Sequence, residues 1–309
     1  MNGDAKPDLV VATECDSTCI GGALRVLMGN GDGTFQASRL YGSEGDQPVD
    51  VVVADVNGDG RPDLLMANCT TCVRSSIGVF LGNGDGTFQP VVNYDSGGTA
   101  ANALAVADLN GDGKPDIAVT NLCLPGGIRG PCTGGYTNYV TVLLGNGDGT
   151  FQSAVNYTSG GSRPNSVAIG DINGDGKPDL LVSNTYPSGS VAVLLGNGDG
   201  TFQEVVNYDA GGVDAGSIAV ADVDGDGKLD VVVVNHAQID SDLGNGVGLL
   251  TGNGDGTLQP AVTYGARPYT SSAVAVADVS ADGRPDLVVA SWSSDNAGSI
   301  AVLINDGNH

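Results

Sequence analysis

Acidic and amide side chains gather at short, regular spacing in the stretch DVNGDGRPDL, which runs from Asp55 to Leu64. Four later stretches repeat it: DLNGDGKPDI from Asp108, DINGDGKPDL from Asp171, DVDGDGKLDV from Asp222 and DVSADGRPDL from Asp278. Oxygen-bearing side chains at alternate positions can converge on one point when the backbone curls, and the interspersed glycines permit that curl. Because a hard divalent cation takes about six to eight oxygens, the spacing predicts a cation-binding loop.

The chemistry of these loops favours Ca²⁺. The donors are all oxygens, whereas soft metals prefer nitrogen and sulfur, and Mg²⁺ demands a tighter octahedral arrangement. Side chains at loop positions one, three, five and nine and the backbone carbonyl at position seven are the expected ligands. They are Asp55, Asn57, Asp59, Arg61 and Asp63; Asp108, Asn110, Asp112, Lys114 and Asp116; Asp171, Asn173, Asp175, Lys177 and Asp179; Asp222, Asp224, Asp226, Lys228 and Asp230; and Asp278, Ser280, Asp282, Arg284 and Asp286.

The five loops differ in detail, and this predicts different affinities for the ion. Asp224 adds a carboxylate at position three and predicts the tightest site, while Ser280 and Ala281 predict the weakest. An EF-hand is excluded because its bidentate Glu at position twelve is replaced by an apolar residue, such as Met66, in every copy. The alternative is a set of Asp/Asn/Gly turns that bind no ion.

Two further markers recur in step with the loops. GNGDGTFQ or a close variant starts one residue after Met28, Leu81, Leu144, Leu195 and Thr251, and a tyrosine follows at Tyr41, Tyr94, Tyr157, Tyr208 and Tyr264. Between the markers lie short β-branched runs with turn signals, and NGDG is typical of a hairpin. The Asp of this turn could in principle bind a second cation, but the favoured interpretation is a plain hairpin turn that binds no ion. The apolar residue after each NGDG turn is expected to be a plug, that is, a side chain that fills the core between neighbouring repeats. These residues are Phe35, Phe88, Phe151, Phe202 and Leu258.

Four short strands per repeat predict an all-β protein, a β-propeller built from six four-stranded repeats. The sequence VAVADVNGDGKPDLVVA followed by VAVLLGNGDGTF resembles the FG-GAP/VCBS repeat family, found in the integrin α-subunit head and in many secreted bacterial proteins. The resemblance implies that each acidic loop joins the first and second strands of a blade. It covers nearly the whole chain, so residues 1–309 are expected to form one domain, with repeats beginning near 1, 48, 101, 164, 215 and 271.

The end repeats lack parts of this pattern. The opening copy, MNGDAKPDL, has no first Asp or first strand, and the last copy stops at LINDGNH, before its fourth strand. We therefore expect either six blades with incomplete ends or part of a seven-bladed ring. We also expect the natural protein to extend upstream, with an Asp just before Met1.

Composition narrows the class of partner. The 309 residues carry a formal net charge of −24, which disfavours nucleic acids and anionic membrane surfaces. No apolar run is long enough for membrane insertion, and no signal peptide is visible. Because the acidity favours cations, we expect a secreted or cell-surface protein in calcium-containing surroundings.

The six cysteines form three close pairs in the first half of the chain. Local disulfides in an oxidising compartment are the favoured interpretation, with metal or redox chemistry at the Cys69–Cys72 C-x-x-C pair as the alternative. The predicted pairs are Cys15 with Cys19, Cys69 with Cys72, and Cys123 with Cys132.

Variable loops are expected on the face opposite the acidic loops, because strand connections alternate between the two faces of a blade. Variable loops on a rigid frame commonly carry recognition, although neutral drift gives the same pattern. The aromatic and basic residues expected on this face are Trp292, Tyr136, Tyr139, Tyr186, Tyr269 and Arg129. Aromatic rings with polar neighbours suit a carbohydrate or an extracellular protein.

Three function classes remain open from the sequence. The favoured one is a calcium-stabilised extracellular binding or adhesion module. The alternatives are a carbohydrate-active propeller enzyme of the lyase or dehydratase type, and a purely structural domain of a larger surface protein. No catalytic residue is assigned, because the carboxylate pairs are explained by the loops and His236 has no evident catalytic partner.

Overall fold

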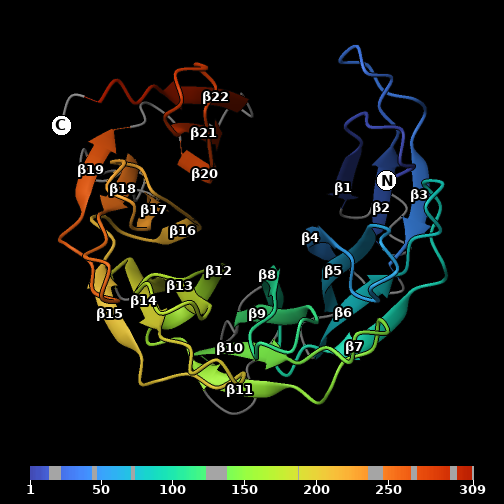
Figure 1. Cartoon of the computed structure of the whole chain (residues 1–309), viewed down its shortest axis with the longest axis horizontal. Helices are drawn as coiled ribbons and strands as arrows, with labels where there is room; N and C mark the ends of the chain where they lie inside the picture. The colour runs from blue at the N-terminus through green and yellow to red at the C-terminus, as the bar shows by residue number, and fades with distance from the viewer. Residues whose placement is uncertain are drawn as a thin grey trace. The chain divides into compact units, whose positions relative to one another are not determined.

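The fold is all-β throughout the part of the chain that the computed structural model describes, which is residues 1–13, 22–43, 47–70, 74–122, 138–186, 188–235, 246–265, 270–292 and 298–307. These residues form six small antiparallel sheets (Figure 1). They contain no helix, and hence none suited to crossing a membrane. The chain divides into two compact units, Met1–Tyr157 and Thr158–His309.

The first unit holds three sheets, of three, four and four strands. Their strands are β1 (Leu9–Thr13), β2 (Ala23–Leu27) and β3 (Arg39–Gly42); β4 (Pro48–Ala54), β5 (Asp63–Thr70), β6 (Arg74–Phe80) and β7 (Val92–Asp95); and β8 (Ala101–Ala107), β9 (Asp116–Leu122), β10 (Asn138–Leu143) and β11 (Val155–Thr158), whose last residue belongs to the second unit.

The second unit also holds three sheets, of four, four and three strands. Their strands are β12 (Ser162–Gly170), β13 (Asp179–Tyr186), β14 (Ser190–Leu194) and β15 (Val206–Asp209); β16 (Ala215–Ala221), β17 (Asp230–Asn235), β18 (Gly246–Leu250) and β19 (Val262–Gly265); and β20 (Thr270–Ala277), β21 (Asp286–Trp292) and β22 (Gly298–Leu303).

Strands lie in chain order within every sheet, and each sheet is one blade of a β-propeller fold. The all-β propeller prediction is therefore confirmed. The described residues of the first sheet include no first strand, and those of the last include no fourth, in agreement with the sequence markers. In the complete sheets the first-to-second and third-to-fourth connections lie at one end of the strands, and the second-to-third connection at the other.

Apolar side chains are buried between successive sheets of each unit. The first strands lie near one another, with β4 packing against β8 and β12 against β16. The second strands are covered on both sides, so all residues of β17 are buried and its sequence DVVVVN does not alternate. Each of the five first strands β4, β8, β12, β16 and β20 has a bulge near its start.

The hairpin aromatics pack against the tyrosine of the preceding sheet. The ring centroids are 5.3 Å apart for Tyr41 and Phe88, and 5.4 Å apart for Tyr94 and Phe151. Phe88 is only 9% exposed, as the plug prediction requires, and Leu258 is also buried. The prediction is wrong for Phe35, which is 42% exposed, because among the described residues of the first unit no sheet precedes its own for it to contact.

Candidate metal centre

Each acidic loop joins the first and second strands of a sheet, and its first Asp holds the loop closed. The Asp55 carboxylate accepts hydrogen bonds from the backbone N–H groups of Gly58, at 2.8 Å, and Gly60, at 2.8 Å. Asp108 accepts the corresponding bonds from Gly111 and Gly113. These glycines lie at positive φ, where residues with a Cβ are strained. The backbone of each of these loops therefore curls in the way that the metal-site hypothesis requires.

Loop positions three and five each accept the N–H two residues further on. Asn57 Oδ1 accepts from the Asp59 N–H at 3.0 Å, and Asp59 Oδ1 accepts from the Arg61 N–H at 2.9 Å. The second carboxylate oxygen of Asp59 faces the Asn57 amide at 3.3 Å. The side chains at these two positions therefore fold back over their own loop.

The ninth-position Asp is a buried link between two connections of its sheet. Asp63 accepts hydrogen bonds from the Val56 N–H at 2.9 Å and from the Gly82 N–H at 2.7 Å, at the start of the next hairpin. Asp116, Asp179 and Asp230 make the same pair of bonds. A Cβ on Gly82 would lie 2.2 Å from the Pro62 carbonyl oxygen, so this contact requires glycine.

Burial raises the pKa of the ninth-position carboxyl in four loops. For Asp63, burial is the largest cause of the raised pKa, the hydrogen bonds from Gly82 and Val56 oppose it, and the nearby charges of Asp59 and Asp55 add to it. The pKa values of Asp116, Asp179 and Asp230 are raised with the same main cause. A cation in the loop would favour the charged form and offset this effect.

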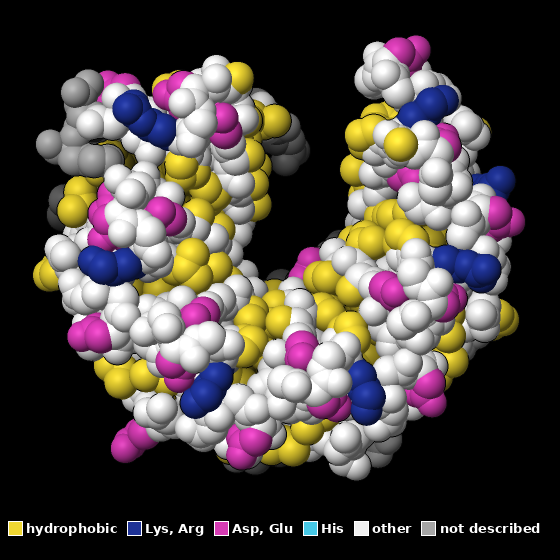
Figure 2. Space-filling model, in the orientation of Figure 1, with side chains coloured by type: hydrophobic (Ala, Val, Ile, Leu, Met, Phe, Trp, Pro, Cys, Tyr) yellow, Lys and Arg dark blue, Asp and Glu magenta, His cyan; other side chains and the backbone are white. Residues whose placement is uncertain are grey.

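The basic residue at position seven pairs with the carboxylate at position five. Lys228 Nζ lies 2.7 Å from Asp226 Oδ2, and the corresponding pairs of Lys114 and Lys177 measure 3.3 and 3.5 Å. The hydrogen bond from the Lys228 side chain is the largest cause of the lowered pKa of Asp226. Basic side chains accordingly lie beside carboxylates in Figure 2. The lysine ammonium marks a place where a cation is attracted.

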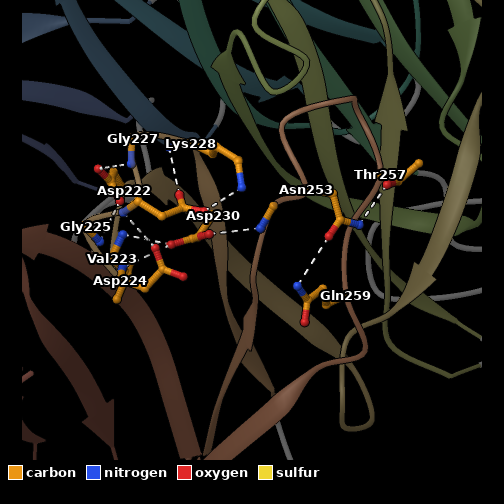
Figure 3. Close-up of polar contacts among 12 residues, drawn as sticks. Asp222, Val223, Asp224, Gly225, Gly227, Lys228, Asp230, Asn253, Thr257 and Gln259 are labelled. Carbon is orange, nitrogen blue, oxygen red and sulfur yellow. Dashed lines mark hydrogen bonds and ion pairs between the residues drawn. The ribbon is translucent and has the colours of Figure 1, made fainter. Parts of the chain in front are cut away.

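The loop from Asp222 has the densest group of carboxylates among the described residues. One oxygen each from Asp222, Asp224 and Asp226 lie within 4.8 Å of one another. Figure 3 shows Asp222 and Asp224 close together, with Asp230 bonded to the backbone beside them. An oxygen-only donor set of this density fits Ca²⁺. These three side chains would contribute ligands to the ion; the predicted ligands of this loop also include Asp230 and the Lys228 carbonyl.

The Asp of the NGDG turn has a structural partner in its own hairpin. Asp85 Oδ1 accepts hydrogen bonds from the N–H of Thr87 at 2.9 Å and from its hydroxyl at 2.5 Å, while the Asn83 amide donates to the same hydroxyl at 2.9 Å. Asp148, Asp199 and Asp255 repeat these contacts. The arrangement is that of a plain hairpin turn.

Two of the six residues predicted for the opposite face can be placed with their side chains. Tyr139 in the first unit and Tyr186 in the second are exposed, and both lie at strand ends remote from the acidic loops. The backbone of Trp292 ends β21, but its side chain lies outside the description, as do all of Tyr136, Tyr269 and Arg129. Of the cysteines, only Cys69 is described, and it is buried.

Sequence reasoning missed a series of buried asparagines at the ends of the second strands. The Nδ2 groups of Asn121, Asn184 and Asn235 donate to the carbonyls of Ser96, Ser159 and Ala210, at 3.0, 2.8 and 2.8 Å. These carbonyls belong to the connection that enters the same sheet. The sequence does contain a signal for these residues, because an Asn follows the apolar run of the second strand at the same place in four repeats, including Asn68.

Known proteins share the repeat and the fold of this chain. A model of the FG-GAP-like repeat matches residues 1–66, 69–119, 132–182 and 173–233, and a model of the FG-GAP repeat matches residues 100–143. Integrin alpha-4 of Xenopus laevis is 28% identical over 172 residues, which cover 47% of this chain and 16% of the integrin.

Solved structures with low sequence identity share the fold. The rhamnogalacturonan lyase PL11 of Bacillus licheniformis aligns with a TM-score of 0.52 at 16% identity, covering 94% of this chain and 60% of the lyase chain. A mutant of the Synechocystis apocarotenoid oxygenase aligns with a TM-score of 0.55 at 12% identity, covering 95% and 66%. The chain thus spans less than two thirds of each of these proteins.

Proposed function

Because the chain belongs to the FG-GAP-like repeat family, whose model matches more than half of it, we propose that it is a calcium-stabilised extracellular binding or adhesion module. The observation that carries the proposal is the contrast between the ends of its sheets. At one end, the acidic loops and hairpins repeat the same hydrogen bonds from sheet to sheet. At the other end, the second-to-third connections differ in length and composition.

Calcium has a structural task in this proposal. Carboxylates held a few ångströms apart repel one another, and a divalent cation between them converts that repulsion into attraction. In the loop from Asp222, the side chains of Asp222, Asp224 and Asp226 contribute ligands to the ion, and Lys228 gives up its contact with Asp226. The loop is already curled by its backbone hydrogen bonds, so binding orders few additional groups.

The proposal includes an extracellular location for the protein. Calcium modules outside the cell commonly bind at about 10⁻⁴–10⁻³ M, a range that loops with two or three carboxylates suit. The three predicted disulfides need an oxidising compartment. Mass spectrometry of unreduced digests tests them, because free thiols at Cys15, Cys72 or Cys132 would contradict that location.

The ligand in this proposal is a carbohydrate or an extracellular protein, bound at the face opposite the acidic loops. Tyr186 in the second unit and Tyr139 in the first unit have exposed rings, each at the end of its own sheet remote from the acidic loops. A ring that is apolar on its faces and polar at its hydroxyl contributes contact area with little loss of side-chain freedom, which suits both kinds of ligand. Trp292 belongs to the same end of its sheet by its position at the end of β21.

The experiment screens calcium-loaded protein against arrays of glycans and extracellular proteins. Replacing Tyr186 and Trp292 with Ala is expected to abolish binding and leave the melting temperature unchanged. Asp59→Ala is expected to lower the melting temperature in calcium only. Leu40→Ala, at an exposed position in β3, is the matched control and should change neither. Full binding by the double variant would show that the ligand face is elsewhere.

A further inference from the structure

An open groove of about 720 Å³ lies within the second unit, between β15 of one sheet and the segment that leads into β19 of the next (Figure 1). Its volume falls in the range of roughly 300–1,000 Å³ that is usual for small-molecule sites. The side chains that give the groove its character are Tyr208, Leu258 and Pro260, which are largely apolar, and Asn207, Asp209 and Gln259, which are polar.

A smaller plug residue leaves this groove open. In the first unit the plug Phe151 contacts Tyr94 edge to face, with the ring centroids 5.4 Å apart. Leu258 occupies the plug position that faces Tyr208, and the two side chains both line the groove. A leucine covers less of a tyrosine ring than a phenylalanine does, so part of the Tyr208 ring is available to a ligand.

The Tyr208 hydroxyl also lacks the partner that its counterparts have. The Tyr94 hydroxyl donates a hydrogen bond to the Gly149 carbonyl at 3.3 Å, and the Tyr41 hydroxyl donates to the Gly86 carbonyl at 3.4 Å. The Tyr208 hydroxyl makes no hydrogen bond to any residue that the structure describes. It is therefore free to donate to a ligand in the groove and to accept from it.

A second free group is the side-chain oxygen of Asn207. In the first unit the Thr141 hydroxyl donates to Asn156 Oδ1 at 2.6 Å. In the second unit Ala192 lies opposite Asn207 and has no hydroxyl to donate. The Asn207 Nδ2 group donates to the Gly160 carbonyl at 2.9 Å, which holds the amide in place, while Oδ1 accepts no bond from the described residues.

The remaining polar groups make the groove rich in acceptors. Asp209 Oδ1 accepts the Gly211 N–H at 2.8 Å, and the second oxygen of this carboxylate has no partner among the described residues. The Gln259 amide nitrogen lies 3.3 Å from Asn253 Oδ1, and Figure 3 shows the two side chains facing each other. No Lys, Arg or His is among the described residues that line the groove, so its chemistry disfavours an anion.

Backbone contacts fix the shape of the groove before a ligand enters. The Thr263 hydroxyl donates to the Gly211 carbonyl at 3.0 Å and joins the two sheets beside the groove. A Cβ on Gly211 would lie only 2.9 Å from Ala261 Cβ, so the connection after β15 packs closely against the next sheet. A site that is already formed loses little conformational freedom when it binds.

We propose that this groove binds a neutral saccharide. The C–H faces of a sugar ring pack against Tyr208, Leu258 and Pro260, and its hydroxyls donate to Asn207 Oδ1 and to the free oxygen of Asp209. The absence of basic residues from the described lining excludes charge pairing with an acidic sugar. The site is separate from the acidic loops and from the proposed ligand face, so the inference does not depend on the proposed function.

The test measures binding of neutral tetrasaccharides of glucose, mannose, galactose and xylose to the full chain by isothermal titration calorimetry. At least one of them is expected to bind saturably, and a tetrasaccharide of galacturonic acid should bind at least about tenfold more weakly, because its carboxylates meet Asp209 without a basic partner. Failure of all four neutral sugars to bind, or equally tight binding of the acidic one, would overturn the inference.

Variants of the chain locate the site. Leu258→Phe extends the plug into the groove and should weaken binding by at least about tenfold, as a filled apolar site requires. Tyr208→Phe removes one hydroxyl and should weaken binding by roughly threefold to tenfold, the usual worth of one hydrogen bond. Tyr94→Phe makes the same change in the first unit and is the matched control, which should bind normally.

Asp209→Ala keeps the test valid if Leu258→Phe does not fold, which urea denaturation establishes. It should also weaken binding, whereas Asp95→Ala is its matched control, because Asp95 accepts the Gly97 N–H in the same way and lies in the first unit. Normal binding by both Leu258→Phe and Asp209→Ala would place the sugar elsewhere. So would loss of binding in the Tyr186→Ala and Trp292→Ala double variant, because the sugar would then occupy the proposed ligand face.

Discussion

At the scale of single residues, the acidic loop divides its carboxylates between two tasks. Asp179 is buried and uses both oxygens to accept backbone N–H groups from Ile172 and Gly196. Asp175 is exposed, and its partners all lie within its own loop, where it accepts the backbone N–H of Lys177 and forms an ion pair with the Lys177 side chain. The first carboxylate therefore supports the fold whether or not an ion is bound, and the second lies on the surface of the loop.

Asp179→Ala is expected to lower the free energy of unfolding by at least about 2 kcal/mol, because it leaves two buried N–H groups unpaired at roughly 1–3 kcal/mol each. Urea denaturation in calcium-free buffer measures this loss. Asp175→Ala is the control in the same loop and should matter only when calcium is present. Equal losses for the two variants in the absence of calcium would contradict this division.

Asp50 predicts a pH dependence outside the acidic loops. Its carboxylate accepts the N–H groups of Val51 and Leu104, both at 2.8 Å, and burial raises its pKa against those bonds. A raised pKa means that the folded state binds the proton more tightly than the unfolded state. The contribution of Asp50 to stability is then fully present below the ordinary pKa of 3.8 and is lost as pH rises through the raised value.

Asp50→Asn removes this titration and makes it measurable. The difference in free energy of unfolding between the parent and the variant should become less favourable to the parent as pH rises above about 3.8, and then level off. Urea denaturation of both proteins across a pH series in calcium-free buffer gives the difference. A difference that grows in favour of the parent with pH would contradict the predicted sign.

Contacts between distant segments limited what the sequence could predict for single residues. Asp63 and Asp59 share one short motif and both stay predicted metal ligands, but the motif does not indicate that Asp63 also joins two connections of its sheet. Its bond to Gly82 joins residues 19 positions apart and is not encoded by spacing within the loop. Asp50 gave no signal because its partner Leu104 belongs to the next sheet.

At the scale of elements, the turns were the most predictable part of the chain. NGDG and the acidic loops require left-handed glycines at fixed places, so they mark the strand ends directly. The bulges in the first strands were not foreseen, because AVAVAD-like runs give no sign of a shift in register. The exposed Phe35 was also missed, since a plug depends on the sheet that precedes it.

Leu258 offers a test of the plug at the element scale. Tyr41 and Tyr94 each contact a Phe edge to face, but the position facing Tyr208 is Leu258, and an open groove lies beside both residues. Leu258→Phe should restore the aromatic pair and raise the free energy of unfolding by about 0.5–1.5 kcal/mol. Urea denaturation measures the change.

The control at this position is Leu258→Ala, which creates a cavity. It should lower the free energy of unfolding by roughly 2–5 kcal/mol, the usual range for a buried Leu. If Leu258→Phe instead lowers stability, the groove does not accommodate the ring and the comparison between sheets fails. The two variants together separate the effect of volume from that of aromatic contact.

At the scale of the whole molecule, the dominant property is its charge. The chain has 36 acidic and 12 basic residues, and the net charge of −24 opposes the compact state through self-repulsion. Ion pairs such as Lys228 with Asp226 are exposed and offset little of this repulsion. Cations therefore stabilise the molecule in two ways, by general screening and by binding in the loops.

These two effects predict different responses to salt. In calcium-free buffer, raising NaCl from about 0.01 to 0.2 M should raise the melting temperature, because the screening length falls from about 30 Å to below 10 Å. Millimolar calcium, compared with NaCl at matched ionic strength, should raise it further. A loop occupied at ten times its dissociation constant adds about 1.4 kcal/mol.

The loop variants decide whether that extra stabilisation is specific. A chain carrying Asp59→Ala, Asp112→Ala, Asp175→Ala and Asp226→Ala should keep its response to NaCl and lose most of its additional response to calcium. These four carboxylates lie on the surface, and their substitution also lowers the net negative charge, so general repulsion falls at the same time. The calcium response is therefore read as the difference from NaCl at equal ionic strength within each protein. If the variant and the parent show the same difference, calcium acts by screening alone and the loops are turns that bind no ion.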